Sequence, residues 1–249
     1  MSDQGFFDGH KSHQRGKDKI EQVVRWLAMF DYSDRQTIAR MLGVSAVGQA
    51  AFFQKLPDTG FFSVEPVPGM RRALFSLTDT GHEYASMLSP DVVFKRRKRM
   101  PAWIYLVHSL SIQAAVLNRG DSVRTFRTEK TLGGLKATHV PDAVVCMEDG
   151  TDIALEVELS QKSNGRIYHI FLAHLRNMSE GHYKRVMYLF NNDGLAQLYR
   201  AKFEATKWPI YRIDPKTHKL GLDATRTFDA TGVIERQTFT FAKEPLYDL

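Results

Sequence analysis

Apolar side chains recur at helical spacing through the first third of the chain. Four segments show this period and predict helices, at residues 18–30, 34–42, 46–56 and 78–87. Gly43 ends the second segment, and Ser45 is placed to cap the third. Two strand-like runs, at residues 60–65 and 72–77, precede the fourth helix and are joined by a turn rich in proline and glycine. We expect residues 1–17, which are polar and charged, to be flexible.

The order of helix, helix, tight turn, helix and hairpin resembles the winged helix-turn-helix family. The resemblance implies a DNA-binding domain over residues 18–94, whose third helix enters the major groove while the hairpin touches the adjacent backbone. The side chains then expected to contact DNA lie on the third helix and at the hairpin tip: Gln49, Gln54, Lys55, Arg71 and Arg72. Winged helices also serve as protein-interaction modules, and this alternative stays open.

Helical and strand patterns alternate in the second half, after a basic segment at residues 95–100 that we interpret as a linker. Helices are predicted at residues 101–118, 166–178 and 195–203. Strands are predicted at residues 123–128, 140–147, 152–159, 186–190 and 209–213, with residues 237–241 as a further candidate. The order α-β-β-β-α-β-α-β predicts an α/β (mixed α+β) domain over residues 101–249 with a mixed central sheet.

The composition is that of an ordinary globular protein with a basic surplus. Hydrophobic residues make up 43% and charged residues 25%, which excludes a disordered chain, and no apolar run is long enough for a membrane span. The N-terminal stretch lacks the apolar segment of a secretory signal and Cys146 is the sole cysteine, so we expect a cytoplasmic protein without disulfides. The net charge of +6 favours an anionic partner. Within the basic segment, Arg96, Arg97 and Lys98 are candidate phosphate contacts, although most such runs are solvated connectors.

Two glutamates share one face of the strand predicted at residues 152–159. With a period of two, Glu156 and Glu158 lie on one face and four apolar side chains lie on the other. Neighbouring carboxylates repel each other unless a positive charge lies between them. A divalent cation provides that charge and binds several carboxylate oxygens. The pattern therefore predicts a metal site on this face.

A third carboxylate depends on the register of the preceding hairpin. If residues 148–150 form a three-residue loop with Gly150 in the left-handed conformation, Asp142 lies opposite Glu156 and shares its face. A two-residue turn would place Asp142 opposite Val157 on the apolar face, where burial of a carboxylate is costly. We therefore expect the three-residue loop and a cluster of three carboxylates.

A proline-aspartate pair ending at Asp142, followed after the hairpin by Glu156-x-Glu158, resembles the signature of the PD-(D/E)XK nucleases. Their α-β-β-β-α-β core is similar to the order predicted over residues 101–190. The resemblance implies a metal-dependent phosphodiesterase in which Asp142 and Glu156 hold Mg²⁺ or Mn²⁺. Glu158 stands where the family usually has a lysine, and we assign it as a metal ligand or an auxiliary to the base. Lys162 can replace that lysine if the strand ends early.

The combination of a basic winged helix with such a core, and the run Glu-x-Glu-Leu-Ser-x-Lys-Ser that starts at Glu156, resembles the replication-relaxation proteins. Within that family it is most similar to the MOBC-type conjugative relaxases. The resemblance implies a plasmid mobilisation enzyme that binds double-stranded DNA near an origin of transfer, nicks one strand and works with a coupling protein or another relaxosome component. Lys162 and Arg166 are then candidate phosphate contacts, and Tyr168 is a candidate nucleophile. The alternative for Lys162 and Arg166 is that they belong to a loop that caps the next helix. The alternative for Tyr168 is that it is a packed aromatic side chain.

Two other functions stay open. A non-catalytic DNA-binding regulator of replication or transcription, with a degenerate nuclease fold, is motivated by the absence of a lysine at position 158. A restriction-type or repair nuclease would cut linear DNA without an origin. The histidines have no metal-binding spacing, and we interpret His169 and His174 as packed polar side chains.

Overall fold

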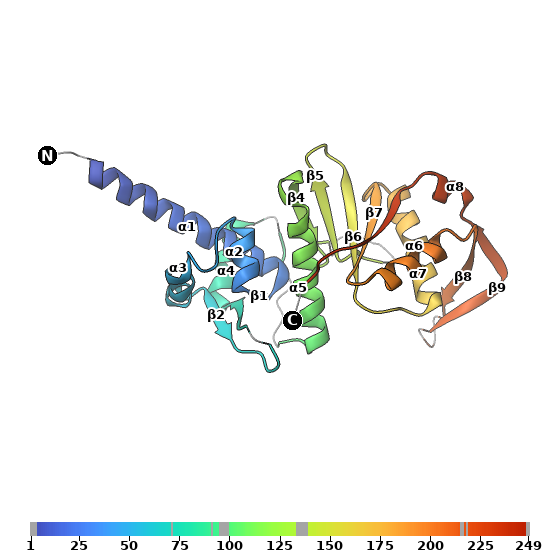
Figure 1. The fold of residues 1–249 in the computed structure, drawn as a ribbon, viewed down its shortest axis with the longest axis horizontal. Helices are drawn as coiled ribbons and strands as arrows, with labels where there is room; N and C mark the ends of the chain where they lie inside the picture. Colours follow the sequence, from blue (N-terminus) through green and yellow to red (C-terminus); the bar gives the residue numbers. More distant parts are fainter. Residues whose placement is uncertain are drawn as a thin grey trace. The chain divides into compact units, whose positions relative to one another are not determined.

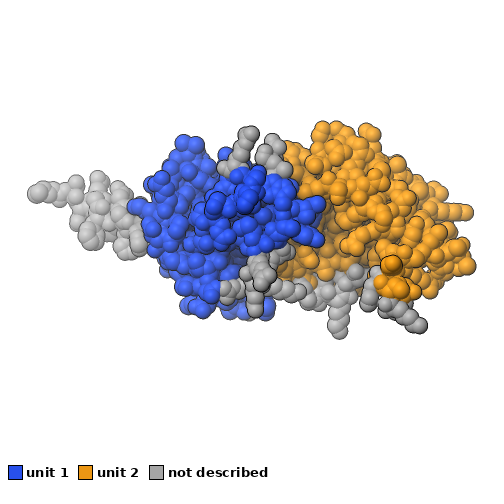
Figure 2. Space-filling view, turned by 90° about the horizontal axis from the view of Figure 1, so that it is seen from below, with its two compact units in different colours: residues 1–113, 249 blue, residues 114–248 orange. Residues whose placement is uncertain are grey.

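The structure is a computed structural model that describes residues 4–70, 72–90, 92–94, 100–132, 139–214, 217 and 219–247. These residues form a mixed α/β fold with eight α-helices and a mixed five-stranded sheet. The chain divides into two compact units, residues 1–113 with 249 and residues 114–248, which Figure 2 shows in different colours. The division falls within helix α5 (Trp103–Asn118). None of the described helices is both long and apolar enough to cross a membrane.

Unit 1 combines helices with a small antiparallel sheet. Before α5, its elements are α1 (Gln4–Phe30), β1 (Ser33–Asp34), α2 (Arg35–Met41), α3 (Ala50–Lys55), the 3₁₀ turn η1 (Pro57–Thr59), β2 (Phe62–Glu65), β3 (Leu74–Leu77) and α4 (Asp79–Leu88). The strands have the order β1-β3-β2. Helix α1 begins at Gln4, earlier than the predicted start at residue 18. Helix α3 begins at Ala50, later than the predicted start at residue 46, because turns occupy residues 46–49.

Capping and close packing explain the boundaries in unit 1. Asp34, which is fully buried, caps α2 by accepting a backbone N–H of its first turn at 2.7 Å, and its other oxygen lies 3.0 Å from Arg72 Nη1. Thr78 caps α4 by accepting the N–H of Gly81 at 3.1 Å. A Cβ at Gly81 would lie 2.2 Å from the carbonyl oxygen of Phe61, so this approach of α4 to the chain before β2 requires glycine.

Unit 2 contains the five-stranded sheet (Figure 1). After α5, its elements are η2 (Gly120–Ser122), β4 (Val123–Thr128), β5 (Ala143–Met147), β6 (Asp152–Glu158), α6 (Asn164–Ser179), β7 (Arg185–Phe190), α7 (Asp193–Phe203), β8 (Lys207–Ile213), β9 (Leu220–Asp229), α8 (Thr231–Glu235) and β10 (Phe239–Lys243). The order β10-β7-β6-β5-β4 joins an antiparallel meander, β4 to β6, to the parallel strands β6, β7 and β10.

Two predicted strands have different outcomes in unit 2. The candidate strand at residues 237–241 is confirmed as β10, which pairs parallel to β7. The strand predicted at residues 209–213 is part of β8, but β8 lies outside the central sheet and pairs with β9 in a separate ribbon. Strands β8 and β9 form a long antiparallel hairpin. The apolar pattern of residues 220–229 did not indicate the strand β9.

An aromatic core holds α6 and α7 against one face of the sheet (Figure 1). Its large side chains come from both helices, from two strands of the sheet (β7 and β10) and from the ribbon: Tyr168, Phe171, Tyr188, Tyr199, Phe203, Trp208, Phe239 and Phe241. Phe171 lies at the centre, fully buried, with its ring 5.3 Å from that of Trp208 and 5.6 Å from that of Tyr188. Each such side chain contributes roughly 1.5–3 kcal/mol on burial. This packing fixes the position of α6 over β6.

The β5–β6 hairpin has the predicted three-residue loop. Ala143 pairs with Leu155, and the N–H of Met147 donates to the carbonyl of Thr151 at 2.9 Å. Gly150 has a φ of 79°, in the left-handed region that a Cβ disfavours. The same register places Asp142, the residue before Ala143, level with Glu156. The prediction of this register, made from the cost of burying Asp142 beside apolar side chains, is confirmed.

Candidate metal centre

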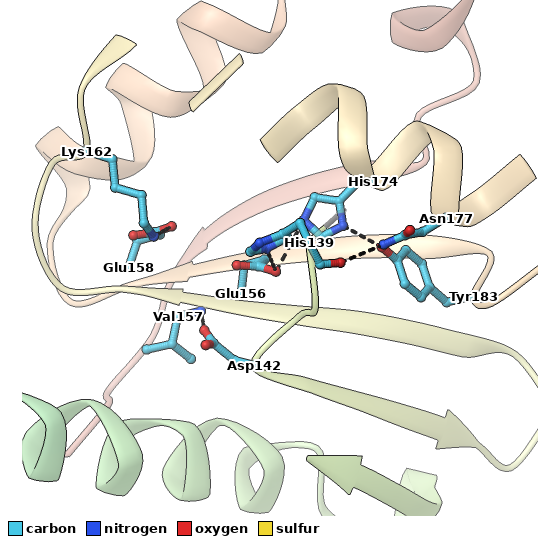
Figure 3. A network of polar contacts seen from close by, with 9 residues as sticks. All are labelled: His139, Asp142, Glu156, Val157, Glu158, Lys162, His174, Asn177 and Tyr183. Carbon is cyan, nitrogen blue, oxygen red and sulfur yellow. Dashed lines mark hydrogen bonds and ion pairs between the residues drawn. The ribbon is translucent and has the colours of Figure 1, made fainter. Parts of the chain in front are cut away.

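Two imidazoles converge on the buried carboxylate of Glu156 (Figure 3). Glu156 is near the end of β6 and is 2% exposed. Its Oε1 lies 2.8 Å from Nε2 of His139, which precedes β5, and 3.2 Å from Nε2 of His174, in the middle of α6. The two rings are nearly perpendicular, with centroids 5.2 Å apart. The site is therefore assembled from a loop, a strand and a helix of unit 2.

A second layer of hydrogen bonds orients the two imidazoles. The side-chain amide of Asn177 donates to the backbone carbonyl of His139 at 2.9 Å and to the hydroxyl oxygen of Tyr183 at 2.8 Å. The Tyr183 hydroxyl lies 2.7 Å from Nδ1 of His174. When Tyr183 donates its own proton to Nδ1, a neutral His174 carries its proton on Nε2, facing Glu156.

Burial and charge act in opposite directions on these three groups. Burial disfavours the Glu156 carboxylate, but the charge and hydrogen bond of His139, with a smaller contribution from His174, hold the pKa of Glu156 well below its usual range. Burial also opposes protonation of His139, yet the neighbouring Glu156 carboxylate raises the pKa of His139. Burial lowers the pKa of His174 in spite of the same carboxylate. The arrangement is thus a negative Glu156, a His139 that readily protonates and a neutral His174.

A second ion pair lies at the end of the same strand. Strand β6 ends at Glu158, and the Nζ of Lys162 makes an ion pair with the Oε1 of Glu158. Burial raises the pKa of Glu158 to about 7, against the opposing effect of Lys162. Asp142, on the neighbouring strand end, accepts the backbone N–H of Val157 at 2.7 Å through Oδ2. Asp142, Glu156 and Glu158 therefore lie near one another but have different partners.

The donor atoms of His139, Glu156 and His174 lie within 4.8 Å of one another, which is close enough to ligate one metal ion. Nε2 of His174 is buried and makes no hydrogen bond within the described residues, although it faces Oε1 of Glu156. A buried imidazole nitrogen placed 3.2 Å from a carboxylate suits either a poorly aligned hydrogen bond to that carboxylate or a metal ion held between them. Two imidazoles and a carboxylate suit Zn²⁺, Fe²⁺, Mn²⁺ or Co²⁺, whereas Mg²⁺ prefers oxygen ligands.

Of the three predicted metal ligands, Asp142, Glu156 and Glu158, the structure places only Glu156 in the group formed with His139 and His174. Asp142 is bound to a backbone N–H and Glu158 to Lys162. Strand β6 ends at Glu158, one residue before the predicted end, and Lys162 reaches back to Glu158. The sequence analysis did not place His139 at this site, and it interpreted His174 as a packed polar side chain; His174 is fully buried and contacts both Glu156 and Tyr183. The available signal was that His174 continues the buried face of α6, after Ile167 and Ile170.

The candidate nucleophile lies in the core. Tyr168 is 9% exposed and its ring packs against those of Phe171 and Trp208, so the structure places it among packed aromatics and not among the polar residues of Figure 3. Arg166 is exposed at the start of α6, where its N–H donates to the capping hydroxyl of Ser163 at 3.4 Å.

The side chains in unit 1 that were predicted to contact DNA differ in exposure and in the partners they already have. Gln54 and Lys55 are exposed on α3. Gln49 accepts a hydrogen bond from the ammonium group of Lys19 at 3.1 Å. The guanidinium of Arg72, expected to reach phosphate, instead pairs with Asp34, because that buried carboxylate needs a cationic partner. The remaining candidates lie outside the described residues: Arg71, Arg96, Arg97 and Lys98.

Comparisons with known proteins gave little. No family model matches the chain, and no curated protein matches it. Among solved structures, a double mutant of ZitR from Lactococcus lactis in its apo form is 21% identical, over 36% of this chain and 73% of that one, with a TM-score of 0.28. A similarity this low assigns neither fold nor function.

Proposed function

We propose that the protein is a divalent-metal-dependent enzyme that nicks one strand of DNA, of the MOBC type that serves plasmid mobilisation. The observation that carries this proposal is the hairpin register. It sets Asp142 level with Glu156, with Glu158 and Lys162 at the same strand end. Acidic side chains on two adjacent strand ends can hold a divalent cation, and a lysine beside them can contact a phosphate, which suits metal-dependent cleavage of a phosphodiester.

The order of elements supports the same proposal. From α5 to β7 the chain runs α-β-β-β-α-β, with an antiparallel meander followed by a parallel strand, which is the order of a PD-(D/E)XK nuclease core. In unit 1, three helices are followed by the antiparallel pair β2–β3 and a fourth helix, as in a winged helix-turn-helix. The exposed Gln54 and Lys55 on α3 are then the side chains that face DNA.

The residues of the site divide the chemistry between them. Asp142 and Glu156 would hold the cation, which, when bound, polarises the scissile phosphate and lowers the pKa of a bound water. Lys162 is partly exposed and is held at the strand end by Glu158, where its ammonium group can neutralise a phosphate oxygen. Val157 fixes Asp142 through its backbone N–H and so keeps that carboxylate beside the site.

The proposal is tested by an assay for relaxation of a supercoiled plasmid. The plasmid carries the origin of transfer of the genetic element that encodes this chain. We expect open circles with Mg²⁺ or Mn²⁺ and none with EDTA. Loss of a residue that hydrogen-bonds to a metal ligand typically reduces activity by roughly 10- to 100-fold. Glu156→Gln removes a ligand itself and should therefore reduce nicking by at least this factor. Glu148→Gln, an exposed glutamate in the loop of the same hairpin, is the matched control and should nick normally. Linear products would indicate a restriction or repair nuclease instead.

One observation favours a second candidate, a non-catalytic DNA-binding regulator. The usual lysine position holds Glu158, and the nearby Lys162 is engaged in an ion pair with it. A folded protein that shifts DNA in a gel but never nicks it, with any divalent ion, would favour the regulator and reject the nicking enzyme.

A further inference from the structure

His139, Glu156 and His174 are spaced as ligands of a small, nitrogen-binding metal ion. Bonds of about 2.0–2.2 Å to a tetrahedral ion place neighbouring ligand atoms about 3.3 Å apart. The distances to Glu156 Oε1 are 2.8 Å from His139 Nε2 and 3.2 Å from His174 Nε2. These two distances are close to that separation, and all three donor atoms lie within 4.8 Å of one another. His139 precedes β5 in a loop and is the least buried of the three.

The buried nitrogen of His174 is the independent sign of a ligand. The side chain is fully buried, and within the described part of the chain Nε2 makes no well-aligned hydrogen bond, although it lies 3.2 Å from Glu156 Oε1. A buried polar atom without a hydrogen bond is costly, and a metal ion would satisfy it. By contrast, His182 lies 3.2 Å from Glu180 in the same unit, and both side chains are partly exposed to solvent.

The hydrogen bonds around the cluster match those that support metal ligands. A ligating histidine usually donates its other ring N–H to a neighbouring acceptor. The hydroxyl oxygen of Tyr183, 2.7 Å from Nδ1 of His174, can accept that N–H once Nε2 binds a metal. Asn177 holds both Tyr183 and the backbone of His139 in place. The ion pair with Glu158 offsets the charge of Lys162, which would otherwise repel a cation.

We infer that His139, Glu156 and His174 form a binding site for one Zn²⁺-class ion, and that this site prefers Zn²⁺ or Co²⁺ to Mg²⁺ because two of its three ligands are imidazole nitrogens. Three protein ligands leave a fourth position for water or a substrate oxygen. Binding displaces the ring proton that faces Glu156. The inference goes beyond the proposed function, since it concerns which ion the chain binds and holds whether or not the chain cuts DNA.

Metal binding to the full chain tests the inference directly. The protein is stripped with a chelator, dialysed against Zn²⁺ or Co²⁺ with excess Mg²⁺ present, and its metal content is measured. We expect one Zn²⁺ or Co²⁺ per chain, visible Co²⁺ absorption bands of four-coordinate intensity, and a rise in melting temperature on Zn²⁺ addition. A folded protein that retains neither ion, or a Co²⁺ spectrum of six-coordinate water type, would overturn the inference and leave a structural hydrogen-bond network.

Variants locate the bound ion. His174→Phe keeps an aromatic ring among Tyr183, Tyr188 and Phe239 and removes the ligand, so binding should be lost. Asn177→Ala leaves all three ligands and should weaken binding by about 10- to 100-fold. His182→Gln is the matched control and should bind normally. Equal binding by His174→Phe, or equal loss in His182→Gln, would place the ion elsewhere and overturn the inference.

The metal content and the nicking assay separate the two proposals. Zn²⁺ binding that depends on His174, without any nicking, supports the metal site and rejects the nicking enzyme. Nicking with Mg²⁺ in a protein that never binds Zn²⁺ or Co²⁺ rejects the metal site and supports the enzyme.

Discussion

Replacement of Tyr183 by phenylalanine would test the network around Glu156 without touching a candidate ligand. Tyr183 is 2% exposed, and its hydroxyl lies 2.7 Å from His174 Nδ1 and 2.8 Å from Asn177 Nδ2. The substitution removes this one oxygen and leaves the ring to fill its place. Any loss of stability therefore measures the polar contacts and not a cavity.

The magnitude follows from the groups left without a partner. Nδ1 of His174 becomes an unsatisfied buried atom, which costs about 1–3 kcal/mol. Asn177 loses one of its two hydrogen bonds and keeps the one to the His139 carbonyl, a net loss of about 0.5–1.5 kcal/mol. We expect Tyr183→Phe to lower the free energy of unfolding by about 2–4 kcal/mol, a large share of the 5–15 kcal/mol typical of a domain.

Urea unfolding of the metal-free chain, followed by tryptophan fluorescence, provides the measurement. Trp208 is fully buried in the core of unit 2 and reports on its unfolding. The midpoint should fall while the slope with urea stays unchanged. The control is Tyr105→Phe, at a side chain that is 63% exposed, which should change stability by less than about 0.5 kcal/mol. If both variants behave alike, the Tyr183 hydroxyl does not support His174, and the account of the network is refuted.

Two further predictions concern the hairpin and the DNA contacts. Gly150→Ala should cost about 1–2 kcal/mol in the same unfolding assay, because the φ of 79° disfavours a Cβ; no loss would mean that the loop readily adopts another conformation. On the proposed function, Lys55→Ala should weaken DNA binding and reduce the slope of affinity against salt by about 1. Arg72→Ala should leave that slope unchanged and lower stability instead, because it removes the ion pair with the buried Asp34; an equal change of slope in both variants would contradict this assignment.

Local patterns were sufficient for the central hairpin and its neighbours. The strand period placed Glu156 and Glu158 on one face, and the cost of burying Asp142 selected the three-residue loop that the structure has. Patterns were insufficient where partners come from distant segments. Strand β8 leaves the central sheet because β9 pairs with it, and α1 extends back to Gln4 through a stretch without an apolar period. The β8–β9 pairing depends on contacts between strands, and the extension of α1 depends on helix propensity. The spacing of apolar residues indicates neither.

The polar site shows the same limit. Glu158 and Lys162 are near neighbours in the chain, so the early strand end that brings them together could be anticipated. His139 and His174 lie in a loop and a helix whose meeting depends on the crossover from β6 through α6 to β7. No local spacing links them, and a histidine on a buried helix face is more often a packed side chain than a ligand.

The choice of ion therefore depends on tertiary structure and not on the strand pattern. A strand that carries Glu156 and Glu158 indicates oxygen ligands and hence Mg²⁺. Helix α6 then brings an imidazole to Glu156, while Asp142 Oδ2 is engaged by the N–H of Val157 and Glu158 by Lys162. If the inferred site binds a metal, nitrogen donors replace the oxygen donors that the pattern counted, and the expected preference shifts from Mg²⁺ toward Zn²⁺. Cleavage assays with Mg²⁺ alone would miss an activity that needs the second ion, so the ions bound by the chain should be identified before absent cleavage is taken as evidence for a regulator.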